Sequence, residues 1–143
     1  VWHNNHGEDI MTTSPNNDRT RLIGWIMSGF VILALLADAA VNLFASDMLK
    51  ATMEAEGFPV SMAPTLGIII LVCAIVYAIP RTAVLGAILI TGFFGGAICV
   101  HFRLGEIGNP PQLICLALAM LTWGGLYLRD PRLRALMPMR AVA

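Results

Sequence analysis

Four long apolar stretches dominate this sequence and leave little chain between them. They run from Leu22 to Ala45, from about Met62 to Ile79, from Thr82 to Val100 and from Gln112 to Leu128. A helix needs about 20 apolar residues to cross the hydrocarbon of a bilayer. In lipid, only helices and closed barrels satisfy their own backbone hydrogen bonds. The sequence therefore predicts an all-α integral membrane protein built as one four-helix transmembrane bundle.

Charged residues make up only 13% of the 143 residues, and the net charge is zero. Because about a quarter of the residues in a soluble domain are Asp, Glu, Lys or Arg, this composition excludes an ordinary soluble domain. No basic stripe is interleaved with aromatic residues, which argues against a nucleic-acid partner. We expect a disordered N-terminal tail over residues 1–20, one membrane domain over 21–129 and a basic C-terminal tail over 130–143.

Positive charges fall mainly on one side of a four-span arrangement. Seven arginines lie beside the termini or in the Pro80–Arg81 turn, whereas the loops on the opposite side contain only Lys50 and Arg103. Lys and Arg next to membrane spans favour the cytoplasmic side. The distribution therefore predicts that both termini are cytoplasmic and that the other two loops face outward.

The first outer loop, "SDMLKATMEAEGFPVSMAP", has a helical pattern of its own. Met48, Leu49 and Met53 fall along one side of a short helix. Gly57 suits the end of such a helix, and Pro59 cannot continue it. We expect a short amphipathic helix on the membrane surface here. The second outer loop, "HFRLGEIGNPPQ", is rich in Gly, Asn and Pro and is expected to be irregular.

The third span is rich in small residues, and Gly92 and Gly96 form a GxxxG spacing on one of its faces. Small residues let membrane helices approach closely, because apolar side chains gain little by leaving lipid. Two interpretations stay open. The glycines pack against a neighbouring helix of the same bundle, or they form a face for a homodimer or another membrane partner.

A carboxylate inside the first span raises the question of a functional site. Asp38 and Asn42 share one helix face, and Asp38 lies about 10 Å below the Ala45 end of the span. The third span delivers His101 and Arg103 to the same outer side. These four residues are the candidate polar pocket, for a small molecule or a proton. The alternative is an Asp38–Arg103 or Asp38–His101 pair that neutralises the carboxylate and fixes the helix register.

The residues needed for most cofactors and for catalysis are missing from the sequence. Membrane haem usually needs two axial histidines on facing helices, and only His101 lies near a span. The three cysteines stand apart without a CxxC, so we expect no metal site. They are expected to be small core residues, with a Cys99–Cys115 disulfide as the alternative. No catalytic residues are assigned, and quinone is the only cofactor that stays open.

Several segments in combination resemble the DoxX-like family of small four-span bacterial membrane proteins. These segments are "LVCAIVYAIPRTAVLGAIL", "GGA…HFRLG" and "WGGLYLRDPRLR", and the resemblance extends from Gly24 to Pro138. The positions that match the family pattern are Asp38, Pro80–Arg81, His101, Arg103, Trp123–Gly125 and Arg129–Asp130. One position departs from it: Ile70, in "IIILVC", stands where relatives often have a glutamate, which reduces the polar pocket that the resemblance implies.

The family is linked by name to the small membrane subunit of a thiosulfate:quinone oxidoreductase, and relatives are tied to redox-protein complexes and to maturation roles. The resemblance therefore implies a bacterial inner-membrane protein that is a non-catalytic accessory or assembly subunit of a redox or quinone-dependent complex. The alternative is an oxidoreductase component that binds quinone or another small lipophilic molecule in an outer pocket near Asp38 and His101. A likeness of this kind constrains architecture better than activity.

Overall fold

The computed structural model describes residues 15–136, and this part of the chain is helical apart from short connections. Its elements are α1 (Pro15–Phe44), α2 (Ser46–Glu56), the 3-10 helix η1 (Val60–Met62), α3 (Ala63–Ala78), α4 (Ala83–Arg103), α5 (Pro110–Arg129) and α6 (Pro131–Leu136). Four segments are long and apolar enough to cross a membrane: Asp18–Phe44 within α1, Val60–Ala78, which includes α3, and the helices α4 and α5. The predicted four-helix membrane bundle is confirmed.

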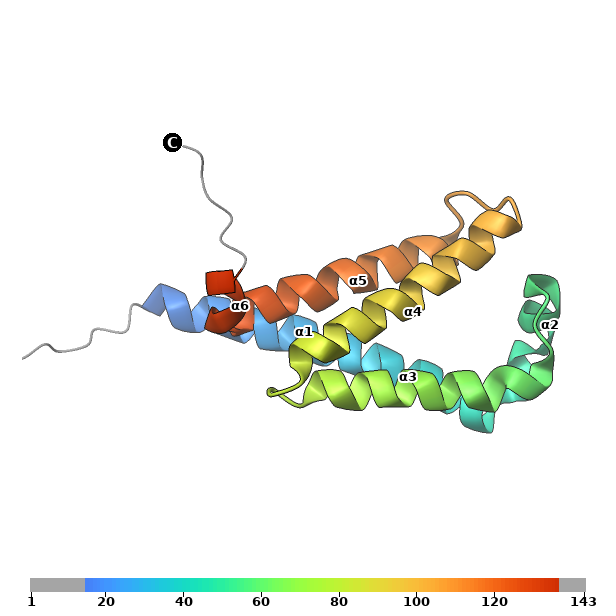
Figure 1. Ribbon diagram of the computed structural model, residues 1–143, viewed down its shortest axis with the longest axis horizontal. Coiled ribbons are helices and arrows are strands. Elements are labelled where there is room, and N and C mark those ends of the chain that lie inside the picture. Colours follow the sequence, from blue (N-terminus) through green and yellow to red (C-terminus); the bar gives the residue numbers. More distant parts are fainter. Residues whose placement is uncertain (1–14, 137–143) are drawn as a thin grey trace, which may run out of the picture.

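The four long helices form a bundle that is tight at one end and open at the other (Figure 1). α1 packs against α3 and α5, and α4 packs against the same two helices from the other side. The start of α1, the turn between α3 and α4, and α6 lie at the tight end, which we call the termini end. The opposite end holds α2 and the loop of residues 104–109, and we call it the α2 end.

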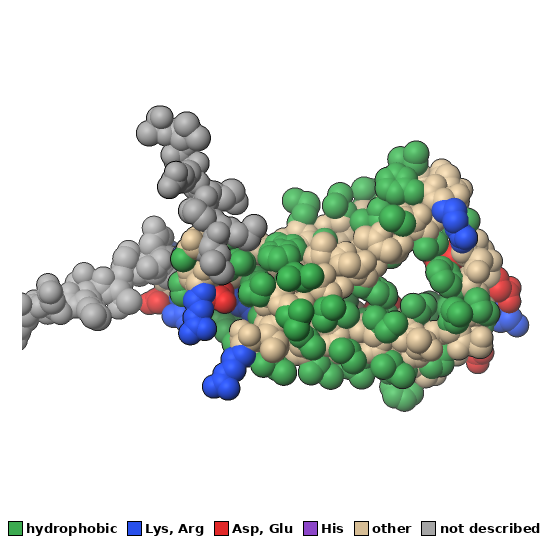
Figure 2. Space-filling view, viewed as in Figure 1, with side chains coloured by type: hydrophobic (Ala, Val, Ile, Leu, Met, Phe, Trp, Pro, Cys, Tyr) green, Lys and Arg blue, Asp and Glu red, His purple; other side chains and the backbone are tan. Residues whose placement is uncertain are grey.

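Near the α2 end, α4 and α5 diverge from α1 and α3, and Figure 2 shows an open space between the two pairs. Apolar side chains cover much of the visible face, and charged side chains gather towards the two ends. This is the arrangement expected of helices whose outer faces contact lipid.

The core is built at the closed part of the bundle around Tyr77, which is fully buried. Glycines allow helix backbones to touch there. A Cβ at Gly86 of α4 would run into the backbone of Tyr77 in α3, and a Cβ at Gly24 of α1 would meet the Gly125 carbonyl and the Arg129 amide of α5. Small residues are therefore what sets the helix spacing, as expected for association in lipid.

Gly92 and Gly96 do not take part in this packing. A Cβ added at either glycine, or at Gly95 between them, would have no heavy atom within 4 Å. Of the two interpretations of the GxxxG spacing, packing within the bundle is therefore contradicted, because α4 touches α3 at Gly86, near its start, and presents Gly92 and Gly96 outward.

The amphipathic helix predicted in the first outer loop is present as α2. Gly57 follows it in the left-handed conformation, with φ of 80°, and its amide donates to the Glu54 carbonyl. A residue with a Cβ adopts this conformation only with strain, which explains the glycine. Two helical segments fall in the predicted tails: α1 begins at Pro15, before the expected boundary at residue 20, and Pro131–Leu136 forms α6.

Candidate functional site

Asp38 and Asn42 lie on one face of α1, one helical turn apart, and contact each other as their spacing predicts. The Asn42 side-chain amide donates to the Asp38 carboxylate at 3.1 Å and to the Asp38 backbone carbonyl at 3.0 Å. Asn42 is buried, whereas Asp38 belongs to the exposed residues of α1. The hydrogen-bond partner of the carboxylate therefore lies on its own helix.

His101 is buried at the end of α4 and is paired with the following loop. Its Nδ1 lies 3.0 Å from Glu106 Oε2, and the same oxygen accepts a 2.8 Å hydrogen bond from Asn109 Nδ2. Because a carboxylate only accepts hydrogen bonds, the Nδ1–H of His101 is the donor. These hydrogen bonds hold the pKa of Glu106 below its ordinary value of 4.5.

Arg103 crosses the open end of the bundle to reach α2. Its Nη2 donates to the Glu56 backbone carbonyl at 2.6 Å. The last carbonyls of a helix lack partners within that helix, and a cation there also interacts favourably with the helix dipole. Arg103 is thus a latch that joins α4 to the C-terminus of α2.

The predicted Asp38–Arg103 and Asp38–His101 pairs are both absent. Among the described residues the one ion pair is His101–Glu106. The reason is the divergence of the helices: α4 leans away from α1 towards the α2 end (Figure 1). His101 and Arg103 therefore find partners in the adjoining loop and in α2 and do not reach the first span.

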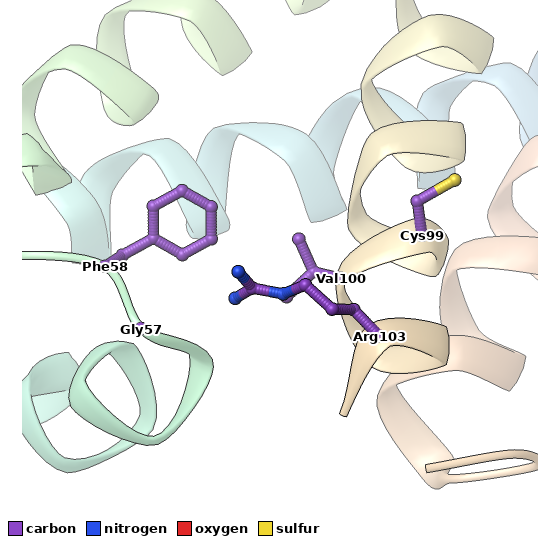
Figure 3. Close-up of a pocket in the computed structure, with 5 residues that line it drawn as sticks. All are labelled: Gly57, Phe58, Cys99, Val100 and Arg103. Atoms are coloured by element: carbon purple, nitrogen blue, oxygen red, sulfur yellow. The ribbon is translucent and has the colours of Figure 1, made fainter. Parts of the chain in front are cut away.

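A pocket of about 300 Å³ lies at this opening, between α2 and α4. Gly57 and Phe58 form one side, and Cys99, Val100 and Arg103 form the other. In Figure 3, Phe58 and the guanidinium of Arg103 project into the space from opposite sides, and the thiol of Cys99 points away from Phe58. Of the four candidate residues, only Arg103 lines it. The pocket combines an apolar wall with one cation, which suits an amphiphilic molecule with a carbonyl or acidic head.

The Glu106 interactions predict a pH-dependent loop. Since the folded-state pKa lies below the ordinary 4.5, the carboxylate stabilises the loop above pH 4.5, and this stabilisation is lost as the pH falls through the lowered value. Hydrogen exchange of residues 104–109, corrected for the intrinsic rate, should therefore increase on acidification. In Glu106→Gln the exchange should already be faster near neutral pH and should change little on acidification. An identical profile in the variant would contradict this assignment.

A second polar cluster, at the termini end, was not predicted. The Tyr77 hydroxyl donates to the Thr122 carbonyl at 2.8 Å and lies 3.1 Å from Ser28 Oγ. Ser28, Tyr77 and Thr122 are fully buried and belong to α1, α3 and α5. The cluster therefore ties three of the four spans together through hydrogen bonds in an apolar interior.

Arg129 completes the cluster at the end of α5. Its side chain is only 6% exposed, and Nη2 donates to the Tyr77 backbone carbonyl at 3.3 Å. The guanidinium carbon lies 4.7 Å from the ring centroid of Trp25 and 5.0 Å from that of Tyr77. Both distances fit cation–π interactions. The sequence indicated only that Arg129 follows the fourth span, and nothing in it marked this arginine as buried.

The cysteines do not form a site. All three are unpaired: Cys73 is buried, Cys115 is partly buried and Cys99 is exposed. The disulfide alternative for Cys99 and Cys115 is thus not formed in this structure, and the expectation that all three are core residues holds for Cys73 alone. Within residues 15–136, no group of three or more His, Cys, Asp or Glu side chains could hold a metal ion.

Comparison with known proteins agrees with this architecture. The sequence profile of the DoxX-like family matches residues 26–125, which include α2 and most of the four spans. The matched range contains Asp38, Asn42, His101 and Arg103, together with the pocket between α2 and α4, whereas Trp25 and Arg129 lie just outside it. No curated protein and no solved structure gave a match. The chain belongs to the DoxX-like family.

Proposed function

We propose that this multi-pass membrane protein is a non-catalytic accessory subunit that holds a small lipophilic molecule, such as a quinone, for a redox partner. The observation that carries the proposal is the pocket between Phe58 and Arg103, which opens at the wide end of the bundle. Ligand sites are concave and mostly apolar, with few polar groups to orient the ligand. This pocket has that composition, with the Arg103 guanidinium available to a carbonyl oxygen.

The α2 latch gives the pocket a means of access. A single side-chain hydrogen bond, from Arg103 to Glu56, joins α2 to α4. Opening it would separate the two walls without disturbing the core around Tyr77, which lies at the other end. The Asp38–Asn42 pair and buried His101 lie towards the same end of the bundle but do not line the pocket.

The proposed surroundings are the inner membrane of a bacterium, with both termini in the cytoplasm, in accordance with the concentration of arginines at the termini end. The outward-facing Gly92 and Gly96 offer a close-packing surface for a membrane partner or a second copy. A topology reporter fused after Arg140 should report a cytoplasmic location, and a periplasmic signal there would contradict the orientation.

Binding of decylubiquinone to the purified protein in lipid nanodiscs tests the pocket. Val100→Trp should abolish binding by filling the space, and Arg103→Gln should weaken it by about ten-fold through the loss of one charge-assisted hydrogen bond. Phe102→Trp is the matched control, because Phe102 lies on the same helix turn but is 54% exposed on the outer face. Equal affinities in wild type and Val100→Trp would overturn the ligand proposal.

The accessory role is tested separately by purification from native membranes. The co-purified fraction should carry a quinone-dependent oxidoreductase activity that the protein alone lacks. Turnover of a quinol analogue by the purified protein alone would favour the alternative, an oxidoreductase component.

A further inference from the structure

The buried arginine at the termini end has an unsatisfied hydrogen-bonding group. Nη1 of Arg129 is inaccessible to solvent and has no hydrogen-bond partner in the described part of the chain. Nε of Arg134, in α6, is in the same state. An unmet buried donor costs about 1–3 kcal/mol, and more when it is charged. Two such donors at one end of the bundle require an explanation.

The described residues do not supply a counter-ion. Asp130 is the acidic residue next to Arg129, but its carboxylate accepts the backbone amide of Arg132 at 2.9 Å and forms no ion pair with either arginine. Arg134 Nη2 donates a hydrogen bond to the Leu128 carbonyl at 3.3 Å. The Arg129 guanidinium lies against the rings of Trp25 and Tyr77, and its Nη2 donates to the Tyr77 carbonyl. These interactions leave Nη1 without an acceptor.

We propose that Arg129, assisted by Arg134, binds a phosphate group at the termini end of the bundle. Guanidinium groups match phosphate oxygens with paired N–H donors, which a lysine cannot do. The site lies where α5 ends and α6 begins, at the edge of the membrane span. A phospholipid headgroup in the adjoining leaflet and free phosphate carry the same chemistry.

Of the two rings that cover Arg129, Trp25 is the one that can move. The guanidinium carbon lies 4.7 Å from the centroid of the Trp25 ring, and Trp25 is 46% exposed, whereas Tyr77 is fully buried. Rotation of this ring would bring Nη1 into reach of a headgroup while the Tyr77 ring stays in the core. This site lies at the end of the molecule opposite the proposed ligand pocket and does not depend on that pocket.

Native mass spectrometry of the delipidated protein with phosphatidylglycerol, and separately with inorganic phosphate, tests the proposal. Arg129→Lys should weaken binding by about ten-fold, the equivalent of one lost charge-assisted hydrogen bond. Arg132→Gln is the matched control, because Arg132 is exposed at the same end and carries the same charge. It should leave binding unchanged. Thermal unfolding of each variant shows whether it is folded.

The outcomes separate the two sources of phosphate. Binding of the lipid that inorganic phosphate does not displace assigns the site to a headgroup, and displacement assigns it to the free anion. Equal binding in wild type and Arg129→Lys, or an equal loss in Arg132→Gln, overturns the proposal. If Arg129→Lys does not fold, the thermal stability of the wild type decides. The unfolding temperature of the wild type should rise to a plateau as phosphatidylglycerol or phosphate is added. No rise with either one contradicts the site.

Discussion

Replacement of Gly86 by alanine should prevent α3 and α4 from packing and should cost the bundle about 3 kcal/mol of unfolding free energy, the upper part of the range for overpacked sites. The added methyl group would meet the Cα and N atoms of Tyr77, which are backbone and cannot rotate away. The short turn around Pro80 joins the two helices, so they cannot slide past each other to make room.

Gly92→Ala is the matched control for this prediction. It adds the same methyl group to the same helix, at a position with no heavy atom within 4 Å. Unfolding in detergent, followed by circular dichroism against temperature or sodium dodecyl sulfate, should show an early transition for Gly86→Ala and a transition like that of the wild type for Gly92→Ala. Coincident transitions for all three proteins would mean that the contact between Gly86 and Tyr77 does not set the helix spacing.

The spans could be predicted from the sequence because few backbone conformations are stable in the hydrocarbon of a bilayer. Every amide within lipid must be bonded internally, so a stretch of about 20 apolar residues is read directly as a helix. The expected span of residues 62–79 is observed as α3, Ala63–Ala78. α2 was also predictable, because Gly57 and Pro59 mark its end.

The candidate site was predictable only in part, since it depends on the angle between helices. Topology placed Asp38 and Arg103 at the same end of the bundle, and there they lie. Whether the two side chains meet is decided by the divergence of α4 from α1, which no local pattern in either span reveals. Arg103 instead bonds to Glu56, through a backbone carbonyl that is invisible in the sequence.

The termini-end cluster was missed for a different reason. Ser28 and Thr122 are small polar residues that hardly alter the hydropathy of a span, and Tyr77 fits equally well at an interface or in a core. Their relation appears only when three helices are placed together. Ile70, which the resemblance marked as a departure from the family pattern, is buried in the core and faces the bundle interior.

Tyr77→Ala is expected to have the largest effect of any single side-chain truncation in the bundle. Truncation of a fully buried aromatic ring costs about 3–5 kcal/mol through lost packing and the cavity left behind. Here the truncation would also remove the hydrogen bond from Tyr77 to Thr122 and the contact of the Tyr77 hydroxyl with Ser28. It would also remove one of the two rings that cover Arg129.

Tyr77→Phe separates these contributions, because it keeps the ring and removes only the hydroxyl. Each net hydrogen bond contributes about 1 kcal/mol, so this variant should unfold between the wild type and Tyr77→Ala in the same detergent titration. Tyr127→Ala, at a partly exposed aromatic residue of α5, serves as the control for loss of a ring without loss of the cluster. If Tyr77→Phe were as unstable as Tyr77→Ala, the hydrogen bonds and not the ring would join α1, α3 and α5. If Tyr127→Ala were as unstable as Tyr77→Ala, Tyr77 would contribute no more to stability than a partly exposed aromatic residue.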